Sequence, residues 1–115
     1  MVREGWMVSY DADTDTGYIG REDRSIPDVV LQFQHGPIQE AGGVNGIQNE
    51  ELIQLLIMRI EALDLRMPSS FNKDALNGLD AAAAALMLRT KKRQEQGVEG
   101  TMRPHSDTEE IVKDA

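Results

Sequence analysis

The stretch QNEELIQLLIMRIEALDLRMPSSFNKDALNGLDAAAAALMLRTKKRQEQG, residues 48–97, predicts two helices joined by a short turn. The first helix is expected over about residues 48–65 and the second over about residues 70–96. Pro68 lies between them, and proline cannot continue the hydrogen-bonded ladder of a helix. Because the connection is so short, we expect the two helices to fold back on each other as an antiparallel hairpin.

Polar residues stand at the expected ends of both helices. Asn45 or Asn49 can cap the first helix. Three residues can cap the second: Ser69, Ser70 and Asn72. Gly97 follows the second helix, at the position after a helix end where glycine is favoured. These residues set the limits of the hairpin.

The first helix is apolar around much of its circumference. One stripe contains Leu52, Leu55, Leu56, Arg59 and Leu63, and three isoleucines widen it: Ile53, Ile57 and Ile60. The second helix has a narrower row: Leu76, Leu79, Ala83, Leu86 and Thr90. A helix that is apolar over so wide an arc needs more than one neighbour. We therefore expect the hairpin partner on one side of it and another subunit on the other.

The first 34 residues read as a polar arm with short β-strands. Trp6 to Tyr10 form a short run with the alternating pattern of a β-strand. Residues 11–17 have the composition of a turn, and Tyr18-Ile19 fits a returning strand. Disorder of this arm is the alternative. A further β-type run covers residues 29–33. The sequence thus predicts an α+β protein, with a small N-terminal β element packed on a C-terminal two-helix hairpin, assembled as an oligomer. The glycine loop and the hairpin span residues 35–101, and residues 102–115 read as a disordered tail.

Composition limits the classes of function. The chain has 115 residues, a net charge of −8 and no cysteine, so we expect one domain without disulfides. The acidic field would repel a nucleic-acid polymer, although a local basic cluster can still bind a small anion. Neither a signal peptide nor a bilayer-spanning apolar run is evident. We expect a cytoplasmic protein with no membrane partner.

Two blocks about fifty residues apart are expected to meet. Residues 36–46, GPIQEAGGVNG, form a glycine-rich loop before the first helix. About as many residues separate the turn from Gln48 as from Arg89, so the hairpin should place Arg89 level with Gln48. Arg89 and Arg93 are four residues apart and share a helix face. Loop amides, a helix N-terminus and two guanidiniums would suit a small phosphate-bearing ligand. The alternatives are an irregular connector and arginines that offset the helix dipole.

No pattern for catalysis or metal binding emerges. Asp11, Asp13, Asp15 and Glu22 have the spacing of calcium-loop ligands, but Thr16 stands where such a loop needs glycine, so we interpret the segment as an acidic turn. His35 and His105 have no partner at ligand spacing. Without a triad or a paired acid and base, we expect a protein that is not an enzyme and needs no cofactor or metal.

Residues spread over both blocks resemble a known family. They are the string His35-Gly36-Pro37, Glu40, Gly43 to Ile47, Glu50, Arg59, Asn72, Ala75-Leu76, Arg89-Thr90, Arg93 and Gly97 to Thr101. This pattern is similar to the phage anti-Thoeris and anti-CBASS helical-hairpin family, over about residues 33–101. Members of that family are sponges, which sequester cyclic nucleotide signals of bacterial immune systems without degrading them.

The resemblance implies a ligand such as glycocyclic ADP-ribose, or a cyclic di- or trinucleotide, bound by a dimer or higher oligomer. Arg89 and Arg93 match paired arginines that contact phosphates, and Asn72 matches a ligand-binding asparagine. This chain departs from the family at Leu63 and Leu65, where members often carry an aromatic residue that would stack on a base. Phe71 or Phe33 are candidates to replace it.

We expect a ligand site made of Arg89 and Arg93 for phosphates, Asn72 for a polar edge, and a loop comprising Gly36, Pro37, Asn45 and Gly46. About 25 Å separates Asn72 from Arg89 along one helix, so a shared site would combine two antiparallel subunits. The alternative function is a helical assembly protein without a small ligand. A weaker alternative is nucleic-acid binding through residues 89–93, against which the acidic net charge argues.

Overall fold

The computed structural model describes residues 1–95 of the chain and divides it into two compact units. The first unit is Met1–Ile47 and the second begins at Gln48. Four predictions lie outside the described residues: the helix end at Gln96, the glycine after it, the block Gly97–Thr101 and the tail 102–115.

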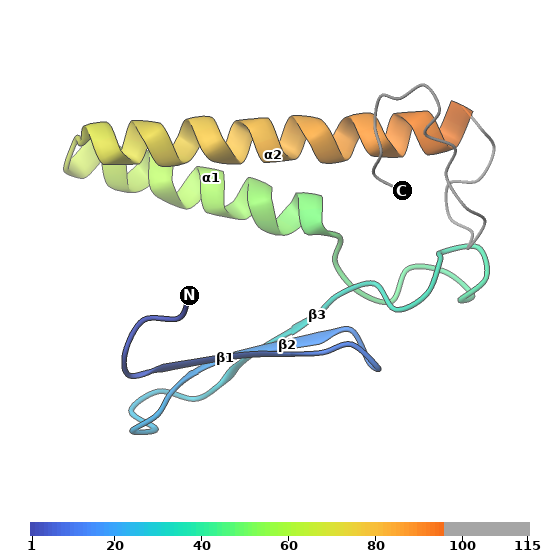
Figure 1. The fold of residues 1–115 in the computed structure, drawn as a ribbon, viewed down its shortest axis with the longest axis horizontal. Coiled ribbons are helices and arrows are strands. Elements are labelled where there is room, and N and C mark those ends of the chain that lie inside the picture. Colours follow the sequence, from blue (N-terminus) through green and yellow to red (C-terminus); the bar gives the residue numbers. More distant parts are fainter. Residues whose placement is uncertain (96–115) are drawn as a thin grey trace. The chain divides into compact units, whose positions relative to one another are not determined.

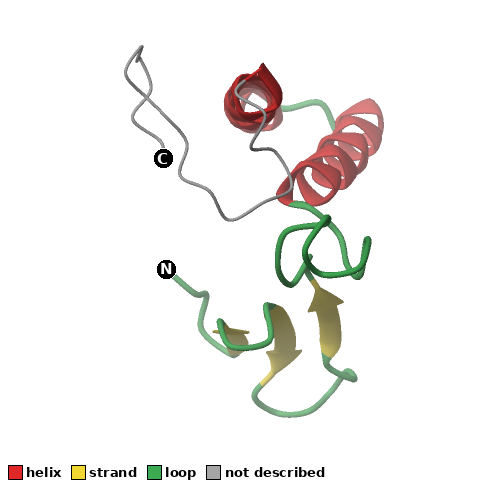
Figure 2. Ribbon diagram, turned by 90° about the vertical axis from the view of Figure 1, so that its right-hand side faces the viewer, coloured by secondary structure: helices red, strands yellow, loops and turns green. Residues whose placement is uncertain are grey.

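The first unit contains a three-stranded antiparallel sheet in the order β1-β2-β3 (Figure 1). Its strands are β1 (Trp6–Asp11), β2 (Thr16–Arg21) and β3 (Val29–Gln32). The strands predicted at these positions are confirmed. Figure 2 shows the chain leaving the sheet at the end of β3 and entering the loop that precedes the first helix.

The turn between β1 and β2 forms because its aspartates bond to the local backbone. The Asp13 amide donates to Asp11 Oδ1 at 2.9 Å, which closes an Asx-type turn. Asp15 then adopts a positive φ of 56°, which aspartate tolerates better than most residues. Thr16 begins β2, and its buried hydroxyl donates to Gln32 Oε1 at 3.0 Å across the sheet. The acidic segment is therefore a structured turn that sets the register of the sheet.

One face of the sheet carries most of its apolar side chains. The register pairs Tyr10 with Gly17 and Gly17 with Leu31, so these residues share a face. Phe33 lies over Gly17, where a Cβ atom would be 3.4 Å from the Phe33 ring, an ordinary van der Waals contact. The rings of Tyr10 and Phe33 meet edge to face, with centroids 6.2 Å apart. Two aromatic rings therefore pack on this face of the sheet.

The second unit is a helical hairpin formed by α1 (Asn49–Arg66) and α2 (Ser70–Glu95), which pack side by side (Figure 1). The prediction that Asn45 or Asn49 caps α1 is wrong, because Gln48 occupies the N-cap position. Its backbone amide donates to Glu51 Oε1 at 2.9 Å, as in a capping box. Ser69 caps α2 as expected, since its hydroxyl oxygen accepts the Phe71 amide hydrogen at 3.0 Å.

The isoleucine side of α1 faces α2. Ile57 is only 7% exposed, whereas Leu55 and Leu56 remain exposed. The row of α2 that is covered repeats with alternating spacings of four and three residues: Asn72, Leu76, Leu79, Ala83, Leu86, Thr90 and Arg93. This spacing is typical of a coiled-coil seam. The row predicted for the second helix is confirmed. The leucine stripe of α1 lies outside the seam at Leu55, Leu56 and Arg59, which are exposed, whereas Leu52 and Leu63 are half-buried.

Sheet and hairpin together confirm the α+β class. That the sheet packs on the hairpin and that the chain is oligomeric stay predictions. No helix within residues 1–95 has the length and apolar character needed to cross a membrane.

Candidate functional site

Two side-chain amides close the glycine loop. Gln34 Nε2 donates to the carbonyl oxygens of Gly36 at 3.1 Å and Gly43 at 3.3 Å. Gln34 Oε1 accepts the Asn45 amide hydrogen at 3.0 Å. The Gln34 side chain therefore joins both ends of the loop. An isolated glutamine belongs to no sequence pattern that would predict this role.

The Asn45 side chain completes the closure. Its Oδ1 accepts the His35 amide hydrogen at 2.8 Å, and its Nδ2 donates to the His35 carbonyl oxygen at 2.9 Å. Asn45 thus pairs with both backbone groups of one residue, as a neighbouring strand would. Since its amide and side chain are already engaged, Asn45 shapes the loop, and a ligand would have to compete for these groups.

Gly46 allows two backbone segments to come into close contact. A Cβ atom at this position would lie 2.5 Å from the Phe33 carbonyl carbon and oxygen, closer than real contacts permit. The next residue, Ile47, forms a parallel bridge with Phe33, and its amide donates to the Gln32 carbonyl oxygen at 2.9 Å. The predicted loop glycine therefore has a structural requirement that does not depend on a ligand.

The middle of the loop is a compact turn that begins at Pro37. The Pro37 carbonyl oxygen accepts the Ala41 amide hydrogen at 2.7 Å, and Gly36 before it has a φ of 81°. Gly42 and Gly43 also have positive φ values, which favour glycine at both positions. All four predicted loop residues, Gly36, Pro37, Asn45 and Gly46, thus lie together in one hydrogen-bonded segment of the first unit.

His35 has an acidic partner that the sequence spacing did not reveal. Its Nδ1 lies 3.0 Å from Asp15 Oδ2, and the Tyr10 hydroxyl donates to the other oxygen of the same carboxylate. Hydrogen bonds from Tyr10 and then from His35 lower the pKa of Asp15. The same bond to Asp15 raises the pKa of Tyr10. The sheet turn brings these residues together, so a reading based on local spacing could not find them.

The two arginines of the predicted site lie on the last turns of α2. Thr90 Oγ1 donates to Glu50 Oε2 at 3.3 Å, which places this part of α2 beside the first turn of α1. The predicted register of the hairpin is therefore confirmed. Arg89 is exposed, whereas Arg93 is only 9% exposed and continues the seam. Although they are four residues apart, the two guanidiniums have different environments.

Asn72 lies at the closed end of the hairpin, where Asp64 organises the turn. Asn72 Nδ2 donates to Asp64 Oδ1 at 3.2 Å and to the Met67 carbonyl oxygen at 3.3 Å. Asp64 Oδ1 also accepts the Ser69 amide hydrogen, and its Oδ2 lies 2.7 Å from Lys73 Nζ. The ion pair with Lys73 and the bond from Ser69 lower the pKa of Asp64. No local sequence pattern marks Asp64 as the centre of this turn.

The predicted ligand residues fall into three groups. The loop residues lie in the first unit, and the arginines lie at the open end of the hairpin in the second. Asn72 and Arg89 lie near opposite ends of one continuous helix, so a single chain does not bring them together. That the loop and the arginines surround one ligand stays a prediction.

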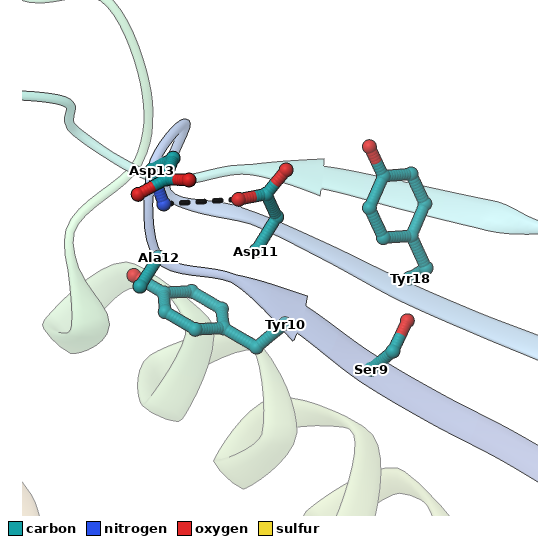
Figure 3. Close-up of a pocket in the computed structure, with 6 residues that line it drawn as sticks. All are labelled: Ser9, Tyr10, Asp11, Ala12, Asp13 and Tyr18. Carbon is teal, nitrogen blue, oxygen red and sulfur yellow. Dashed lines mark hydrogen bonds between the residues drawn. The ribbon is translucent and has the colours of Figure 1, made fainter.

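An open pocket lies at the tip of the β1–β2 hairpin (Figure 3). Its volume is about 460 Å³, and its lining residues are Ser9, Tyr10, Asp11, Ala12, Asp13 and Tyr18. No predicted ligand residue lines it, and two carboxylates on its wall make it unsuited to a phosphate. Within residues 1–95, no group of three or more histidine or acidic side chains could hold a metal ion.

Comparison with known proteins gives one informative match. No protein-family model matches the chain. Over 72 residues it is 38% identical to a protein of Bacillus phage SBSphiJ7 that is named Thoeris anti-defense 1. The match covers 62% of this chain and 50% of the phage protein, so the chain spans about half the length of that relative.

Proposed function

We propose that the protein is a phage anti-defence protein that binds and sequesters a cyclic nucleotide immune signal without cleaving it. The proposed signal is of the glycocyclic ADP-ribose type, with cyclic di- and trinucleotides as further candidates. The similarity to Thoeris anti-defense 1 supports the anti-defence role. The site of action would be the cytoplasm of the infected bacterium, where such a signal is produced.

The observation that carries the ligand proposal is the register of the hairpin. The bond from Thr90 to Glu50 sets the last described turns of α2 beside the N-terminus of α1. Guanidiniums bind phosphates strongly because their hydrogen bonds are charge-assisted, and Arg89 is exposed at this end. Arg93 would join it after a side-chain adjustment, because its side chain is buried.

A complete site would need two copies of the chain. Asn72 and Arg89 are separated by about 25 Å of helix, more than one cyclic nucleotide can span. In an antiparallel pairing, Asn72 of one copy would approach Arg89 and Arg93 of the other. The loop closed by Gln34 and Asn45 would add backbone amides around Gly36 and Gly46. Sequestration would then require slow dissociation and no chemical step.

The test is a titration with glycocyclic ADP-ribose followed by recovery of the ligand. We expect the melting temperature to rise with the logarithm of ligand concentration, and mass spectrometry to return the ligand intact. In Arg89→Ala/Arg93→Ala the rise should disappear while circular dichroism stays unchanged. Arg3→Ala is the control, because it removes an arginine that lies outside the residues of the proposed site. Ligand recovered in cleaved form would rule out a sponge, and full binding by the double variant would rule out this site.

The second candidate is a helical assembly protein without a small ligand. It is favoured by the exposed side of α1, where Leu55 is 62% exposed and Leu65 is 86% exposed. The melting temperature of such a protein would depend on the concentration of the protein itself and would not respond to a ligand. A panel of cyclic nucleotides that leaves the melting temperature unchanged would favour this candidate.

A further inference from the structure

The outer edge of β1 has no neighbouring strand within residues 1–95. The strand order is β1-β2-β3, so β1 is hydrogen-bonded to another strand on one side only. The outer edge of β3 is different, because its last residue, Gln32, accepts the Ile47 amide hydrogen at 2.9 Å. Unpaired backbone groups along an edge strand can bond to a further strand. β1 is therefore the place where this sheet can be extended.

A hydrogen bond before β1 shows which of its backbone groups point outward. The Glu22 amide donates to the Gly5 carbonyl oxygen at 3.0 Å, so these two residues form a hydrogen-bonded pair of the antiparallel ladder. Such pairs alternate with non-hydrogen-bonded pairs, so the backbone groups of Met7, Ser9 and Asp11 point toward β2. The backbone groups of the residues between them point away from β2, into the open edge.

Two residues offer both their amide and their carbonyl at this edge: Val8 and Tyr10. The Trp6 amide is already engaged, because it donates to the Arg3 carbonyl oxygen at 3.1 Å. Val8 is 55% exposed and Tyr10 is 57% exposed, and their side chains share the apolar face of the sheet. Neither lysine nor proline, which protect many edge strands, occurs in β1. The open edge is thus short, apolar and unprotected.

Charge distinguishes the two ends of β1. The end that leads to β2 carries three carboxylates: Asp11, Asp13 and Asp15. At the other end the guanidiniums of Arg3 and Arg21 lie 5.7 and 5.0 Å from the centre of the Trp6 ring, and Glu4 and Asp23 offset part of their charge. A parallel copy of β1 would bring two acidic ends together, which is unfavourable. An antiparallel copy would place each acidic end beside the two arginines of the other copy.

We propose that the outer edge of β1 pairs antiparallel with the same edge of a second copy of the chain and joins the two three-stranded sheets into one. The two-fold axis passes at Ser9, because this register sets Val8 of each copy opposite Tyr10 of the other. Each such pair exchanges two backbone hydrogen bonds, which use the outward groups of both residues. It also places a β-branched side chain beside an aromatic ring, a favourable cross-strand pair. The inference goes beyond the proposed function and needs no ligand.

The experiment makes use of a chain that contains no cysteine. Ser9→Cys introduces a single thiol at the proposed axis, where the two copies would form a non-hydrogen-bonded pair with Cα atoms about 4.5 Å apart. This separation permits a disulfide. After treatment of the full chain with oxidised glutathione, we expect non-reducing electrophoresis to show mostly covalent dimer. Met7→Cys is the matched control: Met7 is exposed on the same face of β1, but the two copies of this residue would lie about 14 Å apart.

Two further variants remove the pairing itself. Val8→Pro lacks the outward amide hydrogen, which does not contribute to the bonds between β1 and β2. Val8→Lys keeps that hydrogen and places a charge on the edge, as natural edge strands do. Combined with Ser9→Cys, either change should greatly reduce the yield of covalent dimer. Melting temperatures verify that each variant is folded, and Val8→Lys decides the test if the proline unfolds the strand.

Three results would overturn this inference. They are the absence of covalent dimer from Ser9→Cys, equal yields of dimer from Ser9→Cys and Met7→Cys, and an undiminished yield in the folded Val8 variants. The last of these would show that the thiols meet by another contact between copies. None of the three bears on the titration with a cyclic nucleotide, so the proposed function would stand.

Discussion

Thr90 donates a hydrogen bond from its hydroxyl to Glu50 across the open end of the hairpin, over 3.3 Å. At the other end Asn72 donates to Asp64 over 3.2 Å. The apolar seam between these pairs contains Ile57, which is 7% exposed. A polar pair at each end makes the register of the hairpin unique, because sliding one helix along the other would break both pairs.

Removing the Thr90 hydroxyl is expected to weaken the open end. Thr90→Val keeps the size of the side chain and leaves the Glu50 carboxylate without this donor. We expect the free energy of unfolding to fall by about 1 kcal/mol, the usual net value of one hydrogen bond. Urea unfolding of Thr90→Val, Glu50→Gln and the double variant measures the coupling of the pair. If the losses in the free energy of unfolding of the two single variants add up to the loss of the double variant, the contact contributes nothing to stability.

The Asp64 cluster predicts an acid-sensitive turn. The folded-state pKa of Asp64 is lowered from 3.8, so its contribution to stability is present above that value and is lost as the pH falls through the folded pKa. Asp64→Asn removes the ion pair with Lys73 and should lower the melting temperature at neutral pH. The difference in melting temperature between Asp64→Asn and the unmodified chain should become smaller below about pH 4. Melting curves from neutral to strongly acidic pH check this, and Asp74→Asn, at an exposed position of α2, is the control.

A methyl group at Gly46 is expected to open the glycine loop. The Cβ atom of Gly46→Ala would lie 2.5 Å from the Phe33 backbone, so the bridge between Phe33 and Ile47 must break. We expect a lower melting temperature and fast amide exchange at Ile47. Gly78→Ala is the matched control, because a Cβ atom there meets nothing within 4 Å. That variant should gain up to about 1 kcal/mol from the better helix propensity of alanine, and a loss as large as that of Gly46→Ala would contradict this account.

A charge on the exposed side of α1 is expected to disrupt assembly. Leu55→Glu places a carboxylate on the leucine stripe outside the seam, where an apolar contact between subunits would have to desolvate it. The mass in light scattering should fall toward that of a single 12.8 kDa chain. Gln54→Glu adds the same charge at the neighbouring exposed position and should leave the mass unchanged. Equal masses for both variants would place the interface elsewhere.

The sequence predicted those elements that depend on local patterns. Both helices and the three strands follow from periodicity and from residues with strong preferences, although disorder was the alternative for the N-terminal strands, and Ser69 was one of three candidate caps. The register of the hairpin followed from counting residues on either side of Pro68. The N-cap was wrong because glutamine is a weak capping residue, and Gln48 succeeds through its backbone bond to Glu51.

The interactions that sequence reading missed join residues far apart in the chain. Asp15 and His35 are separated by 20 positions and meet only because β2 and β3 fold back. Gln34 closes a loop with an amide that carries no charge and belongs to no motif. Local spacing contains no information on such pairs, since the tertiary fold alone decides which side chains become neighbours.

The alternating spacings of four and three residues along α2 have a consequence for the length of the hairpin. Insertion of one residue into α2 would turn every later side chain by about 100° around the helix axis and move Arg89 off its present face. Insertion of a whole seven-residue period into both helices would restore the seam and carry Arg89 about 10 Å further from the turn. The number of heptads in the hairpin therefore fixes the spacing between Asn72 and the arginines, and with it the distance between the two ligand sites that two antiparallel copies would form.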